Sequence, residues 1–531
     1  MRLPRWAVAA AWTAFALAAL LPLVQLLADA LWRDGGWDLT PVWALLLTDS
    51  QWRLLANSLM VAGGASALAV GIGVPLAFAT ERTDLPGRRL LGVLYLVPLL
   101  IPPQLHAIVW LRLLAQNGPI NPFLQHALGL EAAPLGVFSV PGVVFVLGLA
   151  YFPFVTLLTK AGLRTVDPSL EEAALLRQGP LRVIAGITLP LVAPHILAGA
   201  ILVFVFAIID FGVPDILRVR VYAVEIFIQF SALYDKRAAV VLSLPLLAAT
   251  LMLVGLQARL MRGRAYLSLA HGAAGARRYP LNKTRFLALL GCGLVLGLSV
   301  LVPVGTLAFA AGSPGAYARV MEPALSAMGT SLALALAAAG VTTLLACVIA
   351  HSMLRSRRGL RPALHYLTQV PFAVPPILLG IALVGVWNRP ATGWLYDSVA
   401  MIVLGYVAHF LPFAVRAVHA GLQQLDPSLE EAAWLATSRR WRIAGLITLP
   451  LVRGSVAAAF LVVFVLAMGE LGVTLLIAPP GVETLPVRIY NLMHYGAEQA
   501  VAALSLILLA AQLAVCLLVL AAARWHPGGR K

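Results

Sequence analysis

Long apolar runs, separated by short polar segments, follow one another along the whole 531-residue chain. Each run has about 20 residues or more, the length that an α-helix needs to cross the roughly 30 Å hydrocarbon core of a bilayer. Backbone in lipid must satisfy its own hydrogen bonds, so the runs predict membrane-spanning helices. Twelve runs are present, near residues 6–28, 55–80, 90–111, 138–159, 191–214, 238–258, 286–311, 328–354, 362–387, 398–415, 454–478 and 499–523.

The charged residues orient these predicted spans. With both termini inside, the inner segments hold 28 of the 38 Lys and Arg residues but only 8 of the 22 Asp and Glu residues. This is the positive-inside pattern of membrane proteins, so the net charge of +16 calls for no nucleic-acid partner. The first run could be a cleaved signal peptide ending near Ala28-Asp29-Ala30, but its length favours an uncleaved anchor.

The chain contains a sequence repeat. Residues 166–174, Val-Asp-Pro-Ser-Leu-Glu-Glu-Ala-Ala, recur 259 positions later as Leu-Asp-Pro-Ser-Leu-Glu-Glu-Ala-Ala. Residues 187–191, Ile-Thr-Leu-Pro-Leu, recur at 447–451. Each repeat holds six predicted spans, and an even number gives both repeats the same orientation, related by an axis along the membrane normal. The sequence therefore predicts an all-α polytopic membrane protein of two parallel six-helix repeats.

The repeat also predicts the domain organisation. A first half covers residues 1–258 and a second half covers 286–531. Between them, residues 259–285 form a linker with seven basic residues and no acidic one, which the charge rule places in the cytoplasm.

The most similar segments of the two repeats lie in predicted cytoplasmic loops. In the first, Asp167 or Ser169 can cap a short helix, and Pro168 suits its first turn. Ser169 and Glu172 have the spacing of a capping box, as do Ser428 and Glu431. A break follows, at Gln178-Gly179-Pro180 in the first loop and at Thr437-Ser438 in the second. A basic amphipathic stretch then leads to Thr-Leu-Pro and the next span, which predicts a helix-turn-helix on the inner face.

These loops resemble the EAA loops of binding-protein-dependent ABC importer permeases. The resemblance implies that each short helix docks in a groove of a separate ATPase subunit, with small alanines permitting close approach. The alternative is that the glutamates only cap their own helices. The implied docking residues are Glu171, Glu172, Ala173, Ala174, Gly179, Leu189 and Pro190 in the first loop (about 166–190), and Glu430, Glu431, Ala432, Ala433, Thr437, Leu449 and Pro450 in the second (about 425–450). The first loop is one residue short of the family spacing, and Thr437 replaces the family's turn glycine in the second.

Two kinds of residue stand out inside the predicted spans. Asp210 and Glu470 occupy matching places in the repeats, where a buried acid is costly and usually faces a cavity or a partner. They either line a translocation pathway or form scaffold contacts at the outer interface, paired with Arg218 or Arg488. The other kind is proline, which breaks helices and can line a pathway or simply make packing irregular. The candidates are Pro102, Pro103, Pro375 and Pro376.

The chain lacks the signatures of an enzyme. It has four lysines, Lys160, Lys236, Lys283 and Lys531, and none follows a glycine, so no phosphate-binding loop is present. Cys292, Cys347 and Cys516 have no metal-ligand spacing, and we expect no metal site and no cofactor in this chain. ATP would bind to the partner ATPase.

Together these features predict the permease subunit of an ATP-driven importer in a bacterial inner membrane, with both termini cytoplasmic. The expected partners are two copies of an ABC ATPase subunit and a periplasmic or lipid-anchored substrate-binding protein, with membrane lipid around the spans. As a fused two-repeat chain, this protein is similar to the ferric-iron and thiamine importer permeases. The stretches that begin at Asp210 and Glu470 look most like the ferric-iron branch. The alternative is a secondary transporter with parallel six-helix repeats.

Overall fold

The computed structural model describes residues 3–33, 35–46, 48–260, 278–312, 314–357, 359–437 and 440–524. Most of the predicted linker, residues 261–277, lies outside these ranges. The described chain is helical, apart from one antiparallel hairpin of two-residue strands, β1 (Trp32–Arg33) and β2 (Gly36–Trp37). The all-α class is confirmed.

The helices divide between two compact units, which are described separately. Unit 1 contains Met1–Pro41, Gln229–Val241 and Ala311–Lys531, and unit 2 contains Val42–Ile228 and Leu242–Ala310. The first span of the second repeat, residues 285–311, therefore groups with helices of the first repeat. Conversely, the first span of the chain groups with helices of the second repeat. The packing units thus differ from the linear halves of the sequence repeat.

Three long helices form the centre of unit 2: α4 (Asp49–Arg82), α8 (Val140–Thr165) and α11 (Leu189–Ile209). Gly73 of α4 and Gly199 of α11 allow their close approach, since a Cβ atom on either would lie 3.0 Å from backbone atoms of α8. Small residues at helix contacts are typical of membrane proteins. The other elements of unit 2 are α5 (Arg88–Leu94), η2 (Val97–Leu100), α6 (Pro103–Leu114), α7 (Ile120–Leu128), α9 (Pro168–Leu175), α10 (Pro180–Val183), η3 (Ile184–Thr188), α12 (Gly212–Ile216), η4 (Asn282–Thr284), α15 (Arg285–Leu296), η5 (Gly297–Leu301) and α16 (Val302–Ala311).

Unit 1 repeats this centre with α17 (Pro314–Leu354), α21 (Val399–Gln423) and α24 (Leu449–Met468), which pack on one another. The N-terminal span, formed by α1 (Arg5–Phe15), η1 (Ala16–Leu20) and α2 (Leu21–Leu31), packs against α17, α19 and α21. The other elements of unit 1 are α18 (Arg361–Gln369), η6 (Val370–Ala373), α19 (Pro376–Trp387), α20 (Gly393–Tyr396), α22 (Pro427–Ala436), α23 (Arg440–Ile443), η7 (Ala444–Thr448), α25 (Gly472–Ile477), α26 (Leu485–His494) and α27 (Glu498–Arg524). The elements at the unit boundaries are α3 (Thr40–Leu46), α13 (Tyr222–Ser231) and α14 (Lys236–Leu260).

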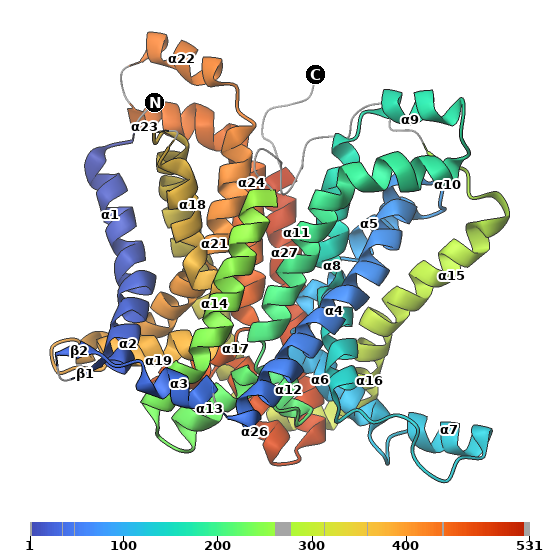
Figure 1. Ribbon diagram of the computed structural model, residues 1–531, viewed down its shortest axis with the longest axis horizontal. Coiled ribbons are helices and arrows are strands. Elements are labelled where there is room, and N and C mark those ends of the chain that lie inside the picture. Colours follow the sequence, from blue (N-terminus) through green and yellow to red (C-terminus); the bar gives the residue numbers. More distant parts are fainter. Residues whose placement is uncertain are drawn as a thin grey trace. The chain divides into compact units, whose positions relative to one another are not determined.

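The predicted spans agree with this helix set. Ten helices in the described residues are long and apolar enough to cross a membrane, and two bent pairs bring the number to twelve if each is one span. The pairs are Arg88–Leu100 with Pro103–Leu114, bent by 89°, and Arg361–Ala373 with Pro376–Trp387, bent by 98°. In Figure 1, α5 lies at the end of unit 2 that carries α9, and α6 lies towards the end that carries α7. That bent pair therefore connects the two ends of its unit.

Both bends occur at the paired prolines, as the sequence predicts. Pro102 and Pro375 are the extended residues directly before α6 and α19, and Pro103 and Pro376 are the first residues of those helices. Proline has no N–H and suits a first helical position, so the second proline of each pair starts a new helix after the break.

Candidate functional site

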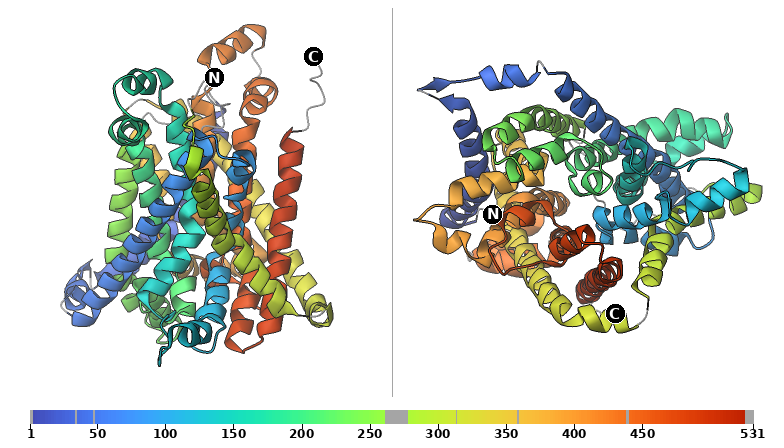
Figure 2. Two further views of the ribbon diagram at one scale, coloured as in Figure 1. Left: turned by 90° about the vertical axis from the view of Figure 1, so that its right-hand side faces the viewer. Right: turned by 90° about the horizontal axis from the view of Figure 1, so that it is seen from below.

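The two repeated loops form short helices at one end of their units. In unit 2, α9 and α10 lie at the end of α8 and α11 opposite to α7 (Figure 1), and Figure 2 shows the same separation from a second direction. In unit 1, α22 and α23 occupy the corresponding place in the chain, between α21 and α24. The predicted short helix and break are therefore present in both loops.

An aspartate caps each short helix. The Asp167 carboxylate accepts a hydrogen bond from the Ser169 amide at 2.9 Å, and the Asp426 carboxylate accepts one from the Ser428 amide at 2.9 Å. These hydrogen bonds hold the pKa of Asp167 and of Asp426 below the usual value for aspartate. Since the caps are aspartates, the predicted capping boxes from Ser169 and Ser428 are wrong: each serine lies inside the first turn.

The two adjacent glutamates of the first loop have different environments. The Glu171 side chain is fully buried and forms an ion pair with Arg82, with 3.0 Å between its Oε2 and Nη1 of the arginine. Its Oε1 accepts a hydrogen bond of 2.6 Å from the Thr188 hydroxyl. Glu172, one position later, is exposed, as is Ala173, while Ala174 is half-buried. Only the second glutamate therefore faces outward and is available to another molecule.

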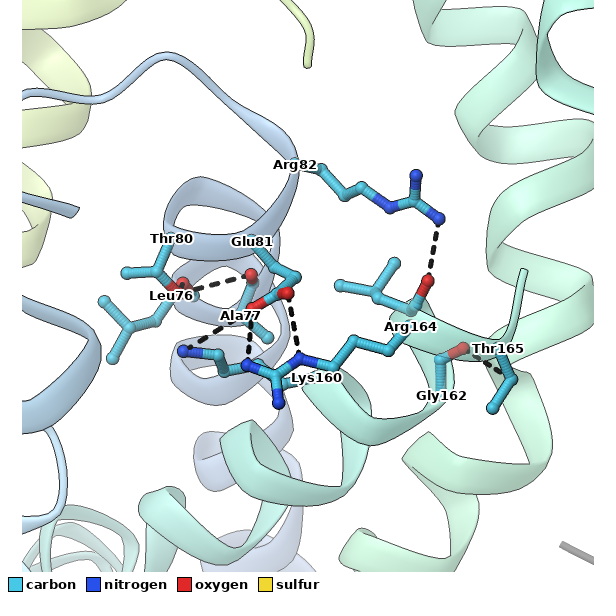
Figure 3. Close-up of polar contacts among 10 residues, drawn as sticks. Leu76, Ala77, Thr80, Glu81, Arg82, Lys160, Gly162, Arg164 and Thr165 are labelled. Atoms are coloured by element: carbon cyan, nitrogen blue, oxygen red, sulfur yellow. Dashed lines mark hydrogen bonds and ion pairs between the residues drawn. The ribbon is translucent and has the colours of Figure 1, made fainter. Parts of the chain in front are cut away.

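Arg82 ties this ion pair to a third helix. It is the last residue of α4, and its Nη2 donates a hydrogen bond of 2.7 Å to the Leu163 carbonyl of α8 (Figure 3). Beside it, Glu81 accepts hydrogen bonds from Arg164 and lies 3.8 Å from the Lys160 ammonium (Figure 3). The ends of α4 and α8 next to α9 are therefore joined by a network of charged groups.

Exposed apolar side chains surround the break in the first loop. Leu176 is 88% exposed and Leu181 is 82% exposed, on either side of Gly179. Gly179 has an ordinary negative φ of −71° and is the residue before α10, so it serves as a helix boundary and not as a left-handed turn. Leu176 and Leu181 therefore form an exposed apolar surface beside the repeated motif.

The second loop carries a similar surface. Leu435 is 93% exposed, Leu446 is 73% exposed, and Trp434 is 42% exposed. Ala432 is exposed and Ala433 is buried, and Thr437 follows the last residue of α22 with an extended backbone. The side chains of Glu430 and Glu431 lie outside the described part of the structure.

The chain after each break differs from the predicted helix-turn-helix in one respect. No separate amphipathic helix ends at Thr-Leu-Pro; instead α10, the π-helix η3 and α11 are continuous over Pro180–Ile209. At the junction the Leu189 amide bonds to the Ile184 carbonyl, five residues back. This wider turn accommodates Pro190, which has no N–H and would crowd the preceding turn of a regular α-helix. Residues 444–450 repeat the arrangement with η7 and Pro450.

The two acids predicted in the spans serve as helix caps. One Asp210 oxygen accepts a hydrogen bond of 2.9 Å from the Val213 amide, and the other accepts one of 3.1 Å from the Tyr151 hydroxyl. Glu470 accepts hydrogen bonds from the amides of Val473 (2.8 Å) and Thr474 (3.0 Å) and from the Thr474 hydroxyl (2.6 Å). Each carboxylate therefore accepts hydrogen bonds from the first turn of the short helix that follows the break, α12 or α25.

The basic residues predicted as partners of these acids have other contacts. Arg488 pairs with Glu483 at 2.6 Å, and the Arg218 guanidinium lies 5.5 Å from the centre of the Phe138 ring. Among the described residues, no group of three or more His, Cys, Asp or Glu side chains could hold a metal ion.

The sequence reasoning missed Arg82 and Thr188. Both are buried polar residues that bind Glu171. Thr188 lies in the repeated segment 187–191 but was given no role there, and Arg82 lies outside both repeated segments. A signal was present: Arg355 lies 273 residues after Arg82, the same offset as between Pro102 and Pro375, and Thr448 lies 260 residues after Thr188 within the repeated segment.

The apolar spans of the chain are duplicated. In each repeat one span is broken at paired prolines, and one short helix carries an exposed apolar surface. Together these features define a multi-pass transport permease. The model of the family "Binding-protein-dependent transport system inner membrane component" matches residues 69–267 and 343–527. The chain belongs to this family. Its two matched segments correspond to the two repeats, and it is a multi-pass inner-membrane protein.

Curated relatives agree with this assignment. The chain is 26% identical to "Fe(3+)-transport system permease protein FbpB 2" of Haemophilus influenzae over 455 residues, which cover 84% of this chain and 85% of that protein. It is 24% identical to "Ferric transport system permease protein FbpB" of Actinobacillus pleuropneumoniae over 486 residues, covering 88% and 70%. A "Molybdenum transport system permease protein ModB" of Mycobacterium bovis is 31% identical over 265 residues, which cover 48% of this chain and 95% of that protein. The last is thus a protein of about half this length.

Proposed function

We propose that this chain forms the translocation pathway of an ATP-driven importer and is driven by two separate ATPase subunits. Each subunit would dock on one repeated loop, and ATP would bind there and not on this chain. The observation that carries the proposal is the exposed surface of the first loop, where Glu172 and Ala173 lie in solvent beside Leu176 and Leu181. Membership of the family supports it, and favours an importer over a secondary transporter.

The chemistry of the surface fits a protein groove. Burying a leucine side chain contributes about 1.5–3 kcal/mol, so Leu176 and Leu181 in the first loop, and Leu435 and Leu446 in the second, supply a substantial part of a stable interface. Exposed Ala173 and Ala432 would let the docked helices approach closely, and Glu172 would pair with a basic group of the partner. Leu189, Pro190, Leu449 and Pro450 would then hold the base of each loop.

Co-purification tests the docking. The chain is expressed with the ATPase encoded beside its gene, and a tag on the chain recovers both. The variant Leu176→Ser/Leu181→Ser is expected to lose most of the ATPase, whereas Leu128→Ser, an exposed leucine on α7 at the other end of unit 2, is expected to retain it. Full recovery of the ATPase with the first variant and with bulky residues in place of Ala173 and Ala432 would refute docking at these loops.

We propose ferric iron as the substrate, with thiamine or another small solute as the less favoured choice. The names of two relatives that cover most of the chain support iron. A periplasmic or lipid-anchored binding protein would deliver it, and in each repeat the pathway would include the acid, Asp210 or Glu470, and the proline break. Calorimetry of the partner binding protein with ferric iron and with thiamine tests this choice, and no binding of iron would overturn it.

The proposed orientation places both termini and both docking loops in the cytoplasm. Single cysteines in place of Leu176 and Leu128 test it, in a chain whose Cys292, Cys347 and Cys516 are replaced by alanine. A membrane-impermeant maleimide applied to spheroplasts is expected to label the Leu128→Cys variant and to spare Leu176→Cys. The reverse labelling pattern would refute the orientation.

A further inference from the structure

One buried carboxylate joins four segments of unit 2. Glu171 belongs to α9, its ion-pair partner Arg82 ends α4, and its hydrogen-bond donor Thr188 lies in η3. Arg82 also donates to the Leu163 carbonyl of α8. The side chains of Arg82 and Glu171 are 1% and 0% exposed, so water does not screen or replace their contact.

This contact determines how α9 can move. A helix of eight residues holds no fixed orientation by itself, because isolated helices of that length are marginal in water. Separating Glu171 from Arg82 would leave two unpaired charges in a buried site, which is strongly unfavourable. A displacement of α9 is therefore expected to carry Arg82 and Thr188 with it, and so to move the inner ends of α4, α8 and α11.

The sequence repeat supports the same conclusion independently. The three residues of the contact recur in the second repeat as Arg355, Glu430 and Thr448. Arg355 directly follows the last residue of α17, and Thr448 is buried at the end of η7. The side chain of Glu430 lies outside the described residues.

The charged neighbours of the contact are not repeated. Glu81, Lys160 and Arg164 correspond to Leu354, His419 and Gln423, and the last two form a hydrogen-bonded pair of their own. The repeats have thus diverged around the contact while retaining the Arg, Glu and Thr. A general requirement for charged residues in this part of the protein would not explain why these three positions in particular are retained.

We propose that Glu171 is a positioning residue that transmits motion of the docked loop to the membrane helices, while Glu172 makes the outward contact. The proposal rests on the proposed function, because it assigns the internal half of the coupling to one of two adjacent glutamates. Glu430 has the same role in the second repeat. The residues that bind the ATPase and the residue that passes on its movement are then distinct.

The first test needs no partner. Spin labels are attached at Leu176→Cys, the residue that follows α9, and at Leu90→Cys on α5, both of them exposed positions, in the cysteine-free chain in nanodiscs. The helix α5 packs against α4, so the label pair reports the position of α9 relative to α4. A narrow distance distribution is expected with the native contact, and a broad one in Arg82→Met/Glu171→Met. This double variant removes both charges together and so avoids leaving one unpaired.

The second test measures coupling in proteoliposomes containing the ATPase and the iron-loaded binding protein. In Arg82→Met/Glu171→Met the ATPase is expected to remain bound, and iron taken up per ATP hydrolysed is expected to fall about tenfold, within the usual range for coupling between sites. Glu172→Gln is expected to weaken ATPase binding instead, with uptake per ATP unchanged in the complexes that form.

The outcomes separate the two proposals. A wild-type chain that binds no ATPase would refute the proposed function, and the label distances would still report on the contact. A double variant with a narrow label distribution would overturn the positioning role of Glu171, and so would a double variant that keeps the wild-type uptake per ATP.

Discussion

Replacing one member of the Arg82–Glu171 pair should destabilise the protein more than replacing both. In Glu171→Met the Arg82 guanidinium stays buried with the Leu163 carbonyl as its acceptor, and in Arg82→Met the carboxylate keeps the hydrogen bond from the Thr188 hydroxyl. Breaking a buried pair in this way costs about 3–5 kcal/mol. Neither side chain is more than 1% exposed, so no reduction for solvent screening applies.

The double variant has a different energy balance. Two methionines have a volume close to that of the pair and leave no charge to desolvate, and such replacements of buried pairs are often neutral. We therefore expect Arg82→Met/Glu171→Met to unfold near the wild-type midpoint, with each single variant well below it. Glu172→Met is the matched control, since an exposed substitution usually changes stability by less than about 0.5 kcal/mol.

The assay is unfolding by sodium dodecyl sulfate in mixed micelles, followed by tryptophan fluorescence. The order of the four midpoints is the result that matters, because the double-mutant cycle isolates the pairwise energy. If the double variant loses as much stability as the two single variants added together, the pair is not a coupled unit and the reasoning fails.

Four further predictions concern other positions. Leu435→Ser/Leu446→Ser should reduce ATPase recovery in co-purification, as in the first loop, and unchanged recovery would confine docking to one repeat. The pKa of Asp167 is lowered in the folded state, so its carboxylate should stabilise α9 at pH values above the unfolded pKa, and this stabilisation should be lost as the pH falls through the folded pKa. Hydrogen exchange of the α9 amides between pH 7 and 3 measures the loss. The variant Asp167→Asn should remove the pH dependence. Gly73→Ala should cost about 1–3 kcal/mol in micelle unfolding, because its Cβ would lie 3.0 Å from the Phe152 carbonyl. Glu470→Gln keeps the shape of the side chain and one of the two acceptor oxygens that bind the Val473 and Thr474 amides, so uptake should fall only slightly if the carboxylate is scaffold, and a large loss would favour a pathway lining.

The membrane fold could be predicted from the sequence because it depends on the length of the apolar runs. Apolar runs of sufficient length give helices in lipid whatever their neighbours are. The breaks at Pro103 and Pro376 were predictable for a similarly local reason, since proline cannot donate the hydrogen bond that would continue the helix.

The site was only partly predictable, because its contacts join residues far apart in the chain. Glu171 and Glu172 are identical in type and adjacent, yet one is fully buried and the other is exposed. The difference is made by Arg82, 89 positions upstream of Glu171. The sequence left the cap open between Asp167 and Ser169 because both residue types cap helices well, and the structure shows that it is Asp167.

The grouping of each repeat's first span with helices of the other repeat has a consequence for synthesis of the chain. Apart from the contacts of Asp29 and Ala30 with Lys236 and Arg237, the span Arg5–Leu31 packs on α17 and later helices, and α17 begins at Pro314, some 280 residues after the span ends. At about 5–20 residues per second, synthesis of these residues takes roughly 15–60 s. During that time the span is surrounded by lipid instead of protein, which its apolar surface permits. The packing of the first span into unit 1 is therefore a late event in biogenesis.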